Sequence, residues 1–261
     1  MAFASAAPAA GSSHSNSSAA GLWLVHSAPR FPNLPSEPGW MQLQHPQTVF
    51  GQHFSCFSLA GNSSIAAVAD LLLSAGPYIY SSRLPASLAG QYPGWALLLA
   101  GAFVHAPVAV NASLVSTAGQ VLSAYAKSRV LNVSLTDAVV GPGLGVGVML
   151  WETWRRSHDA LPSHCPSSGQ GVVQQQHSSL NIDRVAFQGT QYSWGWDQDH
   201  SKWGVSAVAV GAGAEVVCLG DMNRAAWQAH RGGSYVCLWH RGLWEAFHGI
   251  LAAAEPCMWH A

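Results

Sequence analysis

Short apolar runs, separated by polar or by glycine- and proline-rich segments, predict several strands along the chain. Runs of β-branched and aromatic residues bounded by turn residues are typical of strands. We also interpret the glycine-rich segment 139–154 as a buried strand, because glycine allows two backbones to approach closely. The other predicted strands cover residues 22–26, 49–59, 182–187, 205–210, 216–219 and 235–239.

Apolar residues at spacings of three and four predict three helices, at 63–74, 113–129 and 243–254. Ser63 and Ser64 can cap the first helix. In the second, Lys127 and Arg129 lie near the C-terminal end, where cations complement the helix dipole. Strands that alternate with helices predict an α/β fold in layers, with antiparallel pairing near the C-terminus.

The composition indicates a folded protein whose charge depends strongly on pH. The chain has 261 residues, of which 49% are hydrophobic and 9% charged, so it can bury a substantial core. Its formal net charge is −1 with neutral histidines, which excludes a global basic field. The 13 histidines would make it cationic near pH 5. An acidic compartment and a polyanionic substrate fit this behaviour, although histidine can also be merely a common polar residue here.

The N-terminal segment and the cysteines bear on the compartment. Residues 1–20 are rich in Ala, Ser and Gly, which predicts a disordered leader rather than a good signal peptide. No uninterrupted apolar run is long enough to predict a membrane span, so we expect no stable membrane association. The five cysteines contain no C-x-x-C pair, which disfavours a zinc site, and their odd number leaves one thiol without an internal partner. Four glycosylation sequons fit passage through the secretory pathway, at Asn16, Asn62, Asn111 and Asn132.

The segment 199–203 contains the candidate catalytic residues on which our functional interpretation of the chain depends. If it is a strand, His200 and Lys202 project from one face. An imidazole can attack phosphorus or transfer a proton, and an ammonium can neutralise a phosphate oxygen, so the pair suits phosphodiester chemistry without a metal. The simpler alternative is an exposed His-Lys pair on a strand. For His26, which ends an apolar strand, a hydrogen-bonded core histidine is the default interpretation.

Taken together in chain order, the motifs resemble the deoxyribonuclease II family, acid endonucleases of the phospholipase D superfamily. The resemblance covers nearly the whole chain from Gly21. It implies a phospholipase D-like fold of two similar α/β halves. Residues 21–157 would then be the remnant of a first half truncated at its N-terminus, and 158–261 the second half. The matching stretches are 21–29, 50–52 with Cys56, 161–165, 199–203, 218–224, 231–233 with Cys237, 243–247 and 256–257.

The resemblance also implies a reaction and residue roles. The family reaction is metal-independent hydrolysis of DNA at acid pH that leaves 3′-phosphates and needs no cofactor. One histidine attacks phosphorus and another protonates the leaving oxygen. His200 and Lys202 match the second-half H-x-K motif, and Lys202 would also bind phosphate. His26 matches a histidine that the family needs for activity, and Asn223 would orient a phosphate oxygen.

The resemblance further implies how the cysteines pair and in which compartment the protein is located. It pairs Cys165 with Cys257 and Cys218 with Cys237. Cys56 matches a family cysteine whose partner lies in an N-terminal region that has no counterpart here, which leaves Cys56 as the unpaired thiol. Localisation would be lysosomal, vacuolar or secreted.

The sequence departs from the family pattern at its N-terminus. The first H-x-K of the family precedes the strand at 22–26, whereas the corresponding segment here contains only His14, with no lysine two residues later. We therefore do not assign the first motif to His14, and we expect a truncated chain. A homodimer could in principle bring two copies of the second motif together.

Three alternative functions remain open from the sequence. The chain could be a catalytically impaired paralogue that still binds DNA. The 12 tryptophans and the low charge would also suit an extracellular carbohydrate-binding module with exposed tryptophan platforms. A metal hydrolase could use Asp197, Asp199 and His200, although no third-ligand pattern beyond them is apparent.

Overall fold

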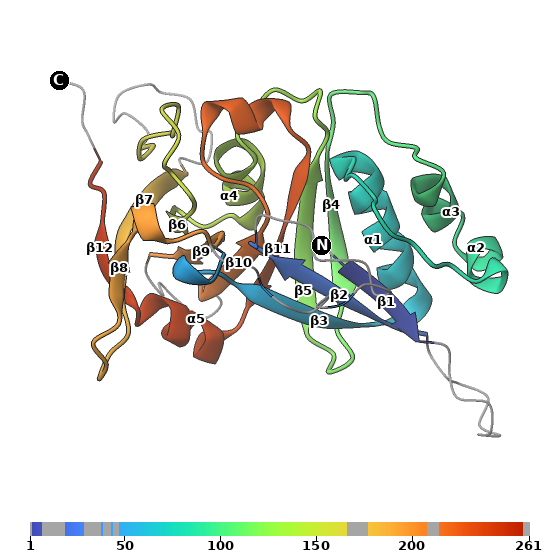
Figure 1. Cartoon of the computed structure of the whole chain (residues 1–261), viewed down its shortest axis with the longest axis horizontal. Helices are drawn as coiled ribbons and strands as arrows, with labels where there is room; N and C mark the ends of the chain where they lie inside the picture. The colour runs from blue at the N-terminus through green and yellow to red at the C-terminus, as the bar shows by residue number, and fades with distance from the viewer. Residues whose placement is uncertain are drawn as a thin grey trace.

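The computed structural model describes residues 2–6, 19–28, 38, 43, 47–165, 177–207 and 214–257. Its largest feature is a mixed sheet of nine strands in the order β12-β7-β6-β9-β10-β11-β5-β4, with β8 paired to β7 (Figure 1). Only β6 and β7 pair in parallel; the other pairs are antiparallel. The strands are β4 (Ala109–Val115), β5 (Val121–Lys127), β6 (Val148–Glu152), β7 (Ser178–Ala186), β8 (Ser193–Gly195), β9 (Trp203–Ser206), β10 (Val216–Gly220), β11 (Gly233–Trp239) and β12 (Leu251–Ala254).

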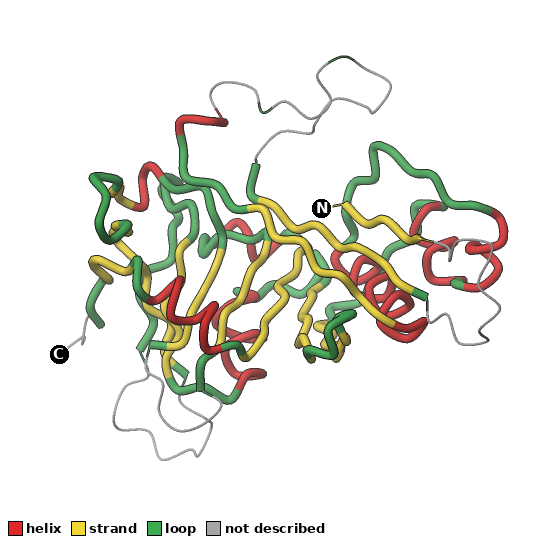
Figure 2. The backbone as a smooth tube through the Cα atoms, turned by 90° about the horizontal axis from the view of Figure 1, so that it is seen from below, coloured by secondary structure: helices red, strands yellow, loops and turns green. Residues whose placement is uncertain are grey.

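A second, three-stranded antiparallel sheet lies against one face of the large sheet (Figures 1 and 2). It consists of β1 (Ala2–Ala6), β2 (Ala20–His26) and β3 (Phe54–Ala60). Burial alternates along β2, where Trp23 and Val25 point into the main core. This period of two is why the segment forms a strand, as the apolar pattern predicted.

Helices pack against the large sheet. Figure 1 shows α1 (Gly61–Ala75), α2 (Ala86–Gln91) and α3 (Pro93–Leu99) grouped beside β4, at one end of the sheet. The short α4 (Gly141–Leu144) precedes β6, and α5 (Arg241–His248) packs on the central strands β9 and β10. The predicted helix at 63–74 is confirmed as α1. Its predicted cap is wrong: Ala60 occupies the N-cap without a side-chain hydrogen bond. The Ser64 hydroxyl instead accepts from the Val115 N–H at 3.0 Å.

The predicted helix at 113–129 is wrong, because this segment forms the hairpin of β4 and β5. Gly119, with φ of 79°, lies in its turn, and a left-handed backbone of this kind favours glycine. Lys127 does not complement a helix dipole. Its side chain is fully buried, and Nζ donates to the carbonyl oxygens of Leu131, Ala229 and Arg231 at 3.1, 2.7 and 2.5 Å.

Two further predictions need correction. Only the end of 139–154 is a strand, β6, after a π-helix at Thr136–Val140 and α4. The stripe at 243–254 is helical only within α5, and its last residues form β12.

The prediction of a disordered leader at 1–20 is wrong in part, because Ala2–Ala6 form β1, which pairs with β2. His14 and Asn16 lie outside the described residues. The large sheet combines β4 to β6 with the later strands, and the division at 157/158 stays a prediction. Within the described ranges, no helix is both long and apolar enough to cross a bilayer.

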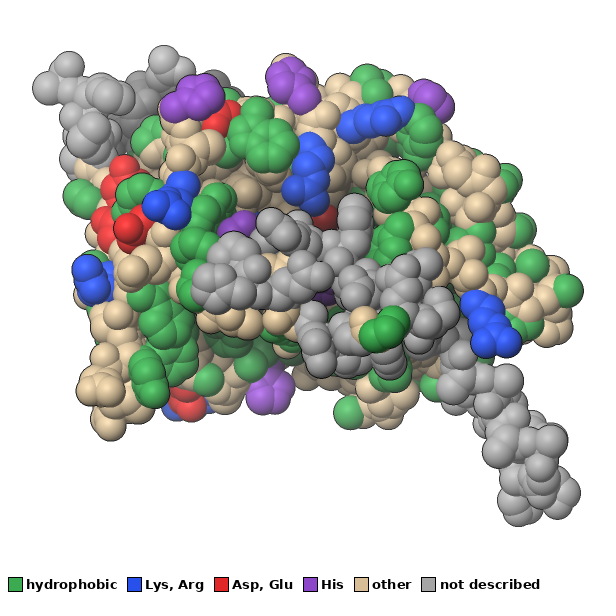
Figure 3. Space-filling model, in the orientation of Figure 1, with side chains coloured by type: hydrophobic (Ala, Val, Ile, Leu, Met, Phe, Trp, Pro, Cys, Tyr) green, Lys and Arg blue, Asp and Glu red, His purple; other side chains and the backbone are tan. Residues whose placement is uncertain are grey.

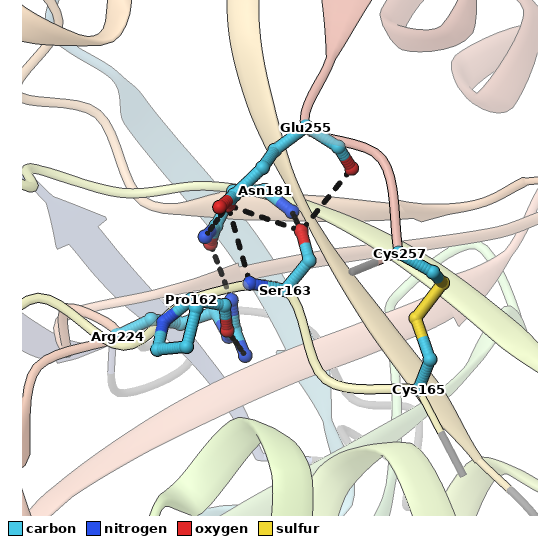
Figure 4. Close-up of a disulfide and its surroundings, with 7 residues drawn as sticks. All are labelled: Pro162, Ser163, Cys165, Asn181, Arg224, Glu255 and Cys257. Atoms are coloured by element: carbon cyan, nitrogen blue, oxygen red, sulfur yellow. Dashed lines mark hydrogen bonds between the residues drawn. A yellow bond between two sulfur atoms is a disulfide. The ribbon is translucent and has the colours of Figure 1, made fainter. Parts of the chain in front are cut away.

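Two disulfides confirm the pairing implied by the resemblance, and Cys56 is free and exposed. Cys218 and Cys237 are directly opposite each other on β10 and β11 and are fully buried. Beside the bond between Cys165 and Cys257, Figure 4 shows a polar network that ties the C-terminal segment to β7. It includes Ser163, Asn181, Arg224 and Glu255.

Candidate active site

The segment that carries His200 and Lys202 is not a strand, because β9 begins only at Trp203. The segment follows a 3₁₀ helix at Trp196–Gln198, and its backbone is extended at Asp199. The two side chains nevertheless lie together: Lys202 Nζ is 3.1 Å from His200 Nδ1. Lys202 is 4% exposed and His200 is partly buried, so this is not the exposed pair of the simpler alternative.

The Asp199 carboxylate holds this segment in shape. Oδ1 accepts from the Ser201 N–H at 2.8 Å and from the Ser201 hydroxyl at 2.5 Å, and Oδ2 accepts from Trp194 Nε1 at 2.9 Å. These bonds give Asp199 a positioning role. For the metal-hydrolase alternative, the described part of the chain contains no group of three or more His, Cys, Asp or Glu side chains arranged to hold a metal ion.

A segment from the small sheet docks directly on the motif through Gly51. The Gly51 N–H donates to the Gln198 carbonyl, and the His200 N–H donates to the Gly51 carbonyl, both at 2.8 Å. A Cβ atom on residue 51 would lie 2.8 Å from Asp199 Oδ1 and 2.9 Å from Trp194 Nε1. Only glycine therefore lets the two backbones approach this closely.

The His200 ring is fixed on two sides. Nδ1 lies 2.9 Å from the carbonyl oxygen of Ser27, and the ring centroid lies 4.8 Å from that of Trp154. Trp154 in turn contacts Phe50 edge to face. Burial, and then the charge of Lys202, lowers the pKa of His200 to about 4.

His26 lies next to Ser27 but makes no hydrogen bond with His200 or Lys202 in the described structure. Its ring stacks on Phe54, the residue opposite it on β3, at a centroid distance of 5.4 Å. Its Nδ1 atom is buried without a hydrogen-bond partner. Burial lowers the pKa of His26 to about 4, and the charge of Lys202 contributes to the shift. The structure thus brings His26 within the electrostatic influence of the motif.

His53 is a site residue that the sequence reasoning missed. Its Nδ1 accepts from the backbone N–H of Lys202 at 3.1 Å, and its Nε2 is buried without a partner. Burial, and then the charge of Lys202, lowers its pKa to about 3. The signal was weak, because a histidine just before an apolar strand does not reveal which backbone it will meet. Its only clue was its position between the matching stretch 50–52 and the matching Cys56.

Acidic groups surround the Lys202 ammonium. Burial, and then the charge of Arg231, lowers the pKa of Lys202 to about 7, while Asp221, Asp199 and Glu152 oppose this shift. Glu152 was also missed from the sequence. It lies on β6 opposite Trp203, and burial, followed by the charge of Asp199, raises its pKa well above the ordinary value.

Asn223 follows β10 on the other side of the motif. The Gly220 N–H donates to the Lys202 carbonyl at 3.0 Å, which connects the start of this turn to the site. The Asn223 backbone N–H donates to Gln228 Oε1 at 3.2 Å, and its side-chain Oδ1 is buried without a partner. The structure records no hydrogen bond between Asn223 and His200 or Lys202 among the residues it describes.

Comparisons with known proteins agree on one family. The family model described as Deoxyribonuclease II matches residues 7–257. Deoxyribonuclease-2-alpha of Mus musculus is 30% identical over 239 residues, which are 91% of this chain and 64% of the mouse protein. Deoxyribonuclease-2 of Caenorhabditis elegans is 30% identical over 238 residues, which are 91% of this chain and 58% of the nematode protein. The chain therefore spans about three fifths of the length of the curated relatives it matches.

Proposed function

The chain belongs to the deoxyribonuclease II family, and from this premise we propose that it is a deoxyribonuclease II-like acid endonuclease. It hydrolyses DNA phosphodiesters without a metal and leaves 3′-phosphates. The observation that carries this proposal is the contact between His200 and the buried Lys202, an imidazole and an ammonium 3.1 Å apart.

His200 is the nucleophile in this proposal. The Ser27 carbonyl oxygen can only accept, so its contact with Nδ1 places the ring proton on Nδ1. The Lys202 ammonium, which lies 3.1 Å from the same nitrogen, then donates to the His200 carbonyl oxygen at 2.5 Å and not to the ring. The other nitrogen, Nε2, then carries the lone pair that attacks phosphorus. A backbone carbonyl that fixes the tautomer in this way is a common means of orienting a reactive histidine.

Lys202 neutralises the phosphate, and its protonation sets the working pH. Its ammonium is charged below a pKa of about 7, and His200 is neutral above a pKa of about 4. Between these values the site contains both a neutral nucleophile and a cation, which is the pair that the reaction needs. This interval lies on the acid side of neutrality.

His26 is the imidazole that protonates the leaving oxygen as His200 Nε2 displaces it from phosphorus, and water then hydrolyses the P–N bond to leave the 3′-phosphate and free His200. Because the pKa of His26 is lowered to about 4, His26 carries this proton at the acid end of the interval. Asn223 orients a phosphate oxygen. For His26, the support is its match to the family and its position beside Ser27, within the influence of Lys202. For Asn223, the support is its match to the family and its position three residues after Gly220, whose N–H donates to the Lys202 carbonyl; its Nδ2 would donate to the phosphate.

Two disulfides suit an oxidising compartment, and we propose a lysosomal, vacuolar or secreted location. Figure 3 shows Lys, Arg and His side chains scattered over one face of the molecule rather than gathered into one basic patch. DNA binding at this face would therefore depend on the site itself and on histidines that become charged in acid.

The test is cleavage of supercoiled plasmid at pH 5 in EDTA by the wild type, His200→Ala, and a control, His158→Ala, whose side chain is exposed. We expect cleavage by the wild type and the control, and its loss in His200→Ala with an unchanged circular dichroism spectrum. Loss of wild-type cleavage on adding EDTA would refute the histidine mechanism. An intact plasmid that is nevertheless bound at pH 5 would instead support a catalytically impaired DNA-binding paralogue.

The carbohydrate-binding alternative gains little support. Among the tryptophans that the structure describes, Trp227 alone is classed as exposed, at 50%. Binding to a panel of polysaccharides, and its loss in Trp227→Ala, would be needed to favour it.

A further inference from the structure

The contact between His53 and Lys202 fixes the proton of the His53 ring. The donor is the backbone N–H of Lys202, so His53 Nδ1 must accept with its lone pair. A neutral ring with an unprotonated Nδ1 carries its proton on Nε2. The geometry therefore makes His53 Nε2–H a hydrogen-bond donor, and that donor is buried without an acceptor among the described residues.

The ring is held firmly in this position. The His53 N–H donates to Ser27 Oγ at 2.9 Å, and the Ser27 N–H donates to the His53 carbonyl at 3.1 Å. The Ser27 hydroxyl donates to Gln52 Oε1 at 2.5 Å. His53 is only 9% exposed, so its side chain is oriented by backbone contacts on both sides and not by solvent.

The surroundings of His53 favour an anion. The charges that act on its ring are those of Lys202 and His26, and both lower its pKa. The ring contacts the Lys202 backbone and feels the charge of the Lys202 ammonium, and an N–H donor together with an ammonium binds phosphate oxygens in many sites. Because its pKa is about 3, the ring stays neutral in mild acid and keeps both its acceptor and its donor.

We propose that His53 is a phosphate-binding residue of the site, whose Nε2–H donates to a non-bridging oxygen of the phosphodiester next to the Lys202 ammonium. The inference rests on the proposed phosphodiesterase function and adds a third imidazole to it. In this arrangement His53 exchanges no proton with the substrate. It couples the position of the Lys202 backbone to the position of the phosphate.

Two substitutions separate this role from a merely structural one. In His53→Asn, the side-chain Oδ1 can take the place of Nδ1 and accept from Lys202, but no donor reaches the position of Nε2. In His53→Gln, the amide can reach the position of Nε2 with an N–H, but the acceptor for the Lys202 backbone is lost. The first variant removes the proposed phosphate contact, and the second removes the structural contact.

The experiment is a titration of inorganic phosphate at pH 5, followed by heteronuclear NMR of the histidine ring nitrogens in the full chain. The wild type should show His53 as the Nε2–H tautomer, identified by the signals that vanish in His53→Asn, and phosphate should shift its Nε2–H resonance. We expect His53→Asn to weaken phosphate binding about 10- to 100-fold, the range for a hydrogen bond to a charged group. His53→Gln should retain affinity within a few-fold of the wild type.

Two results would overturn the proposal: an Nε2–H resonance that phosphate does not move, or equal phosphate affinity in His53→Asn and the wild type. The first needs only the wild-type protein, so an unstable variant does not remove the test. Neither measurement requires cleavage. A wild type that leaves plasmid intact would refute the proposed nuclease function, while the phosphate titration would still decide the role of His53.

Discussion

Replacing Gly51 with alanine tests whether the close docking of two backbones builds the site. The new Cβ would lie 2.8 Å from Asp199 Oδ1 and 2.9 Å from Trp194 Nε1. Neither atom can move easily, because the two groups bond to each other and Asp199 also holds Ser201. The residue 51 backbone would therefore have to withdraw from the motif.

The expected cost follows from the contacts that this withdrawal would strain. Overpacking of a close contact costs about 1–3 kcal/mol. The two 2.8 Å backbone bonds of Gly51, to Gln198 and from His200, contribute about 0.5–1.5 kcal/mol each. Because only part of both terms is lost when the backbone relaxes, we expect the free energy of unfolding to fall by about 2–4 kcal/mol.

Urea denaturation measures this loss, and Gly147→Ala is the matched control. An added Cβ at residue 147 meets no atom within 4 Å, and its φ is not positive. Both substitutions reduce the entropy of the unfolded chain similarly, so the difference between the two variants isolates the strain in the folded state. Plasmid cleavage at pH 5 should fall about 10- to 100-fold in Gly51→Ala alone, since small displacements of reacting groups cost this much.

Equal unfolding free energies for Gly51→Ala and Gly147→Ala would refute this reasoning. Such a result would mean that the segment at residue 51 can move away from Asp199 at no cost. A destabilised variant with undiminished cleavage would refute only the second step, in which His200 depends on this docking for its position.

Three further predictions concern pH, a buried cation and the thiols. Wild-type cleavage should be highest near pH 4, where His200 can lose its proton while His26 still carries one, and should fall as pH rises toward about 7, where Lys202 also loses its proton; a pH–rate profile checks this. Lys127→Met should lower the free energy of unfolding by about 2–4 kcal/mol, measured in urea, because three carbonyl oxygens lose a charged donor. A thiol reagent should label the exposed Cys56 in the native protein. A mild reductant should reduce the partly exposed disulfide between Cys165 and Cys257 before the buried one between Cys218 and Cys237.

Acid should also destabilise the folded protein through His53. Its folded pKa of about 3 lies below the ordinary value of 6.5, so the unfolded state binds more protons in acid. The stability is fully present above pH 6.5 and is lost as pH falls toward 3. Between about pH 7.5 and 4.5 the loss is about 3 kcal/mol for this one group. His53→Asn should lose correspondingly less in urea denaturation at the two pH values, and an identical loss in both proteins would contradict the assignment.

The sequence determined those elements whose pattern admits one interpretation. A short apolar run at residues 22–26 predicted a strand that matches β2, and helical spacing at 63–74 predicted α1. The order of the motifs identified the family, and with it the two disulfides and the free Cys56. Each of these depends on residues that are near in sequence or on a pattern shared with relatives.

Tertiary structure decided which element forms where the local pattern is ambiguous, and which residues meet when they are distant in sequence. Residues 113–129 fit a helical spacing, but the sheet offered β11 as a partner for β5, and burial between strands overrode local preference. His53 has no pattern of its own. It belongs to the site because the start of β3 reaches the Lys202 backbone, 149 residues along the chain. A sequence can name the chemical groups of a site, but only the packed backbone decides which of them touch.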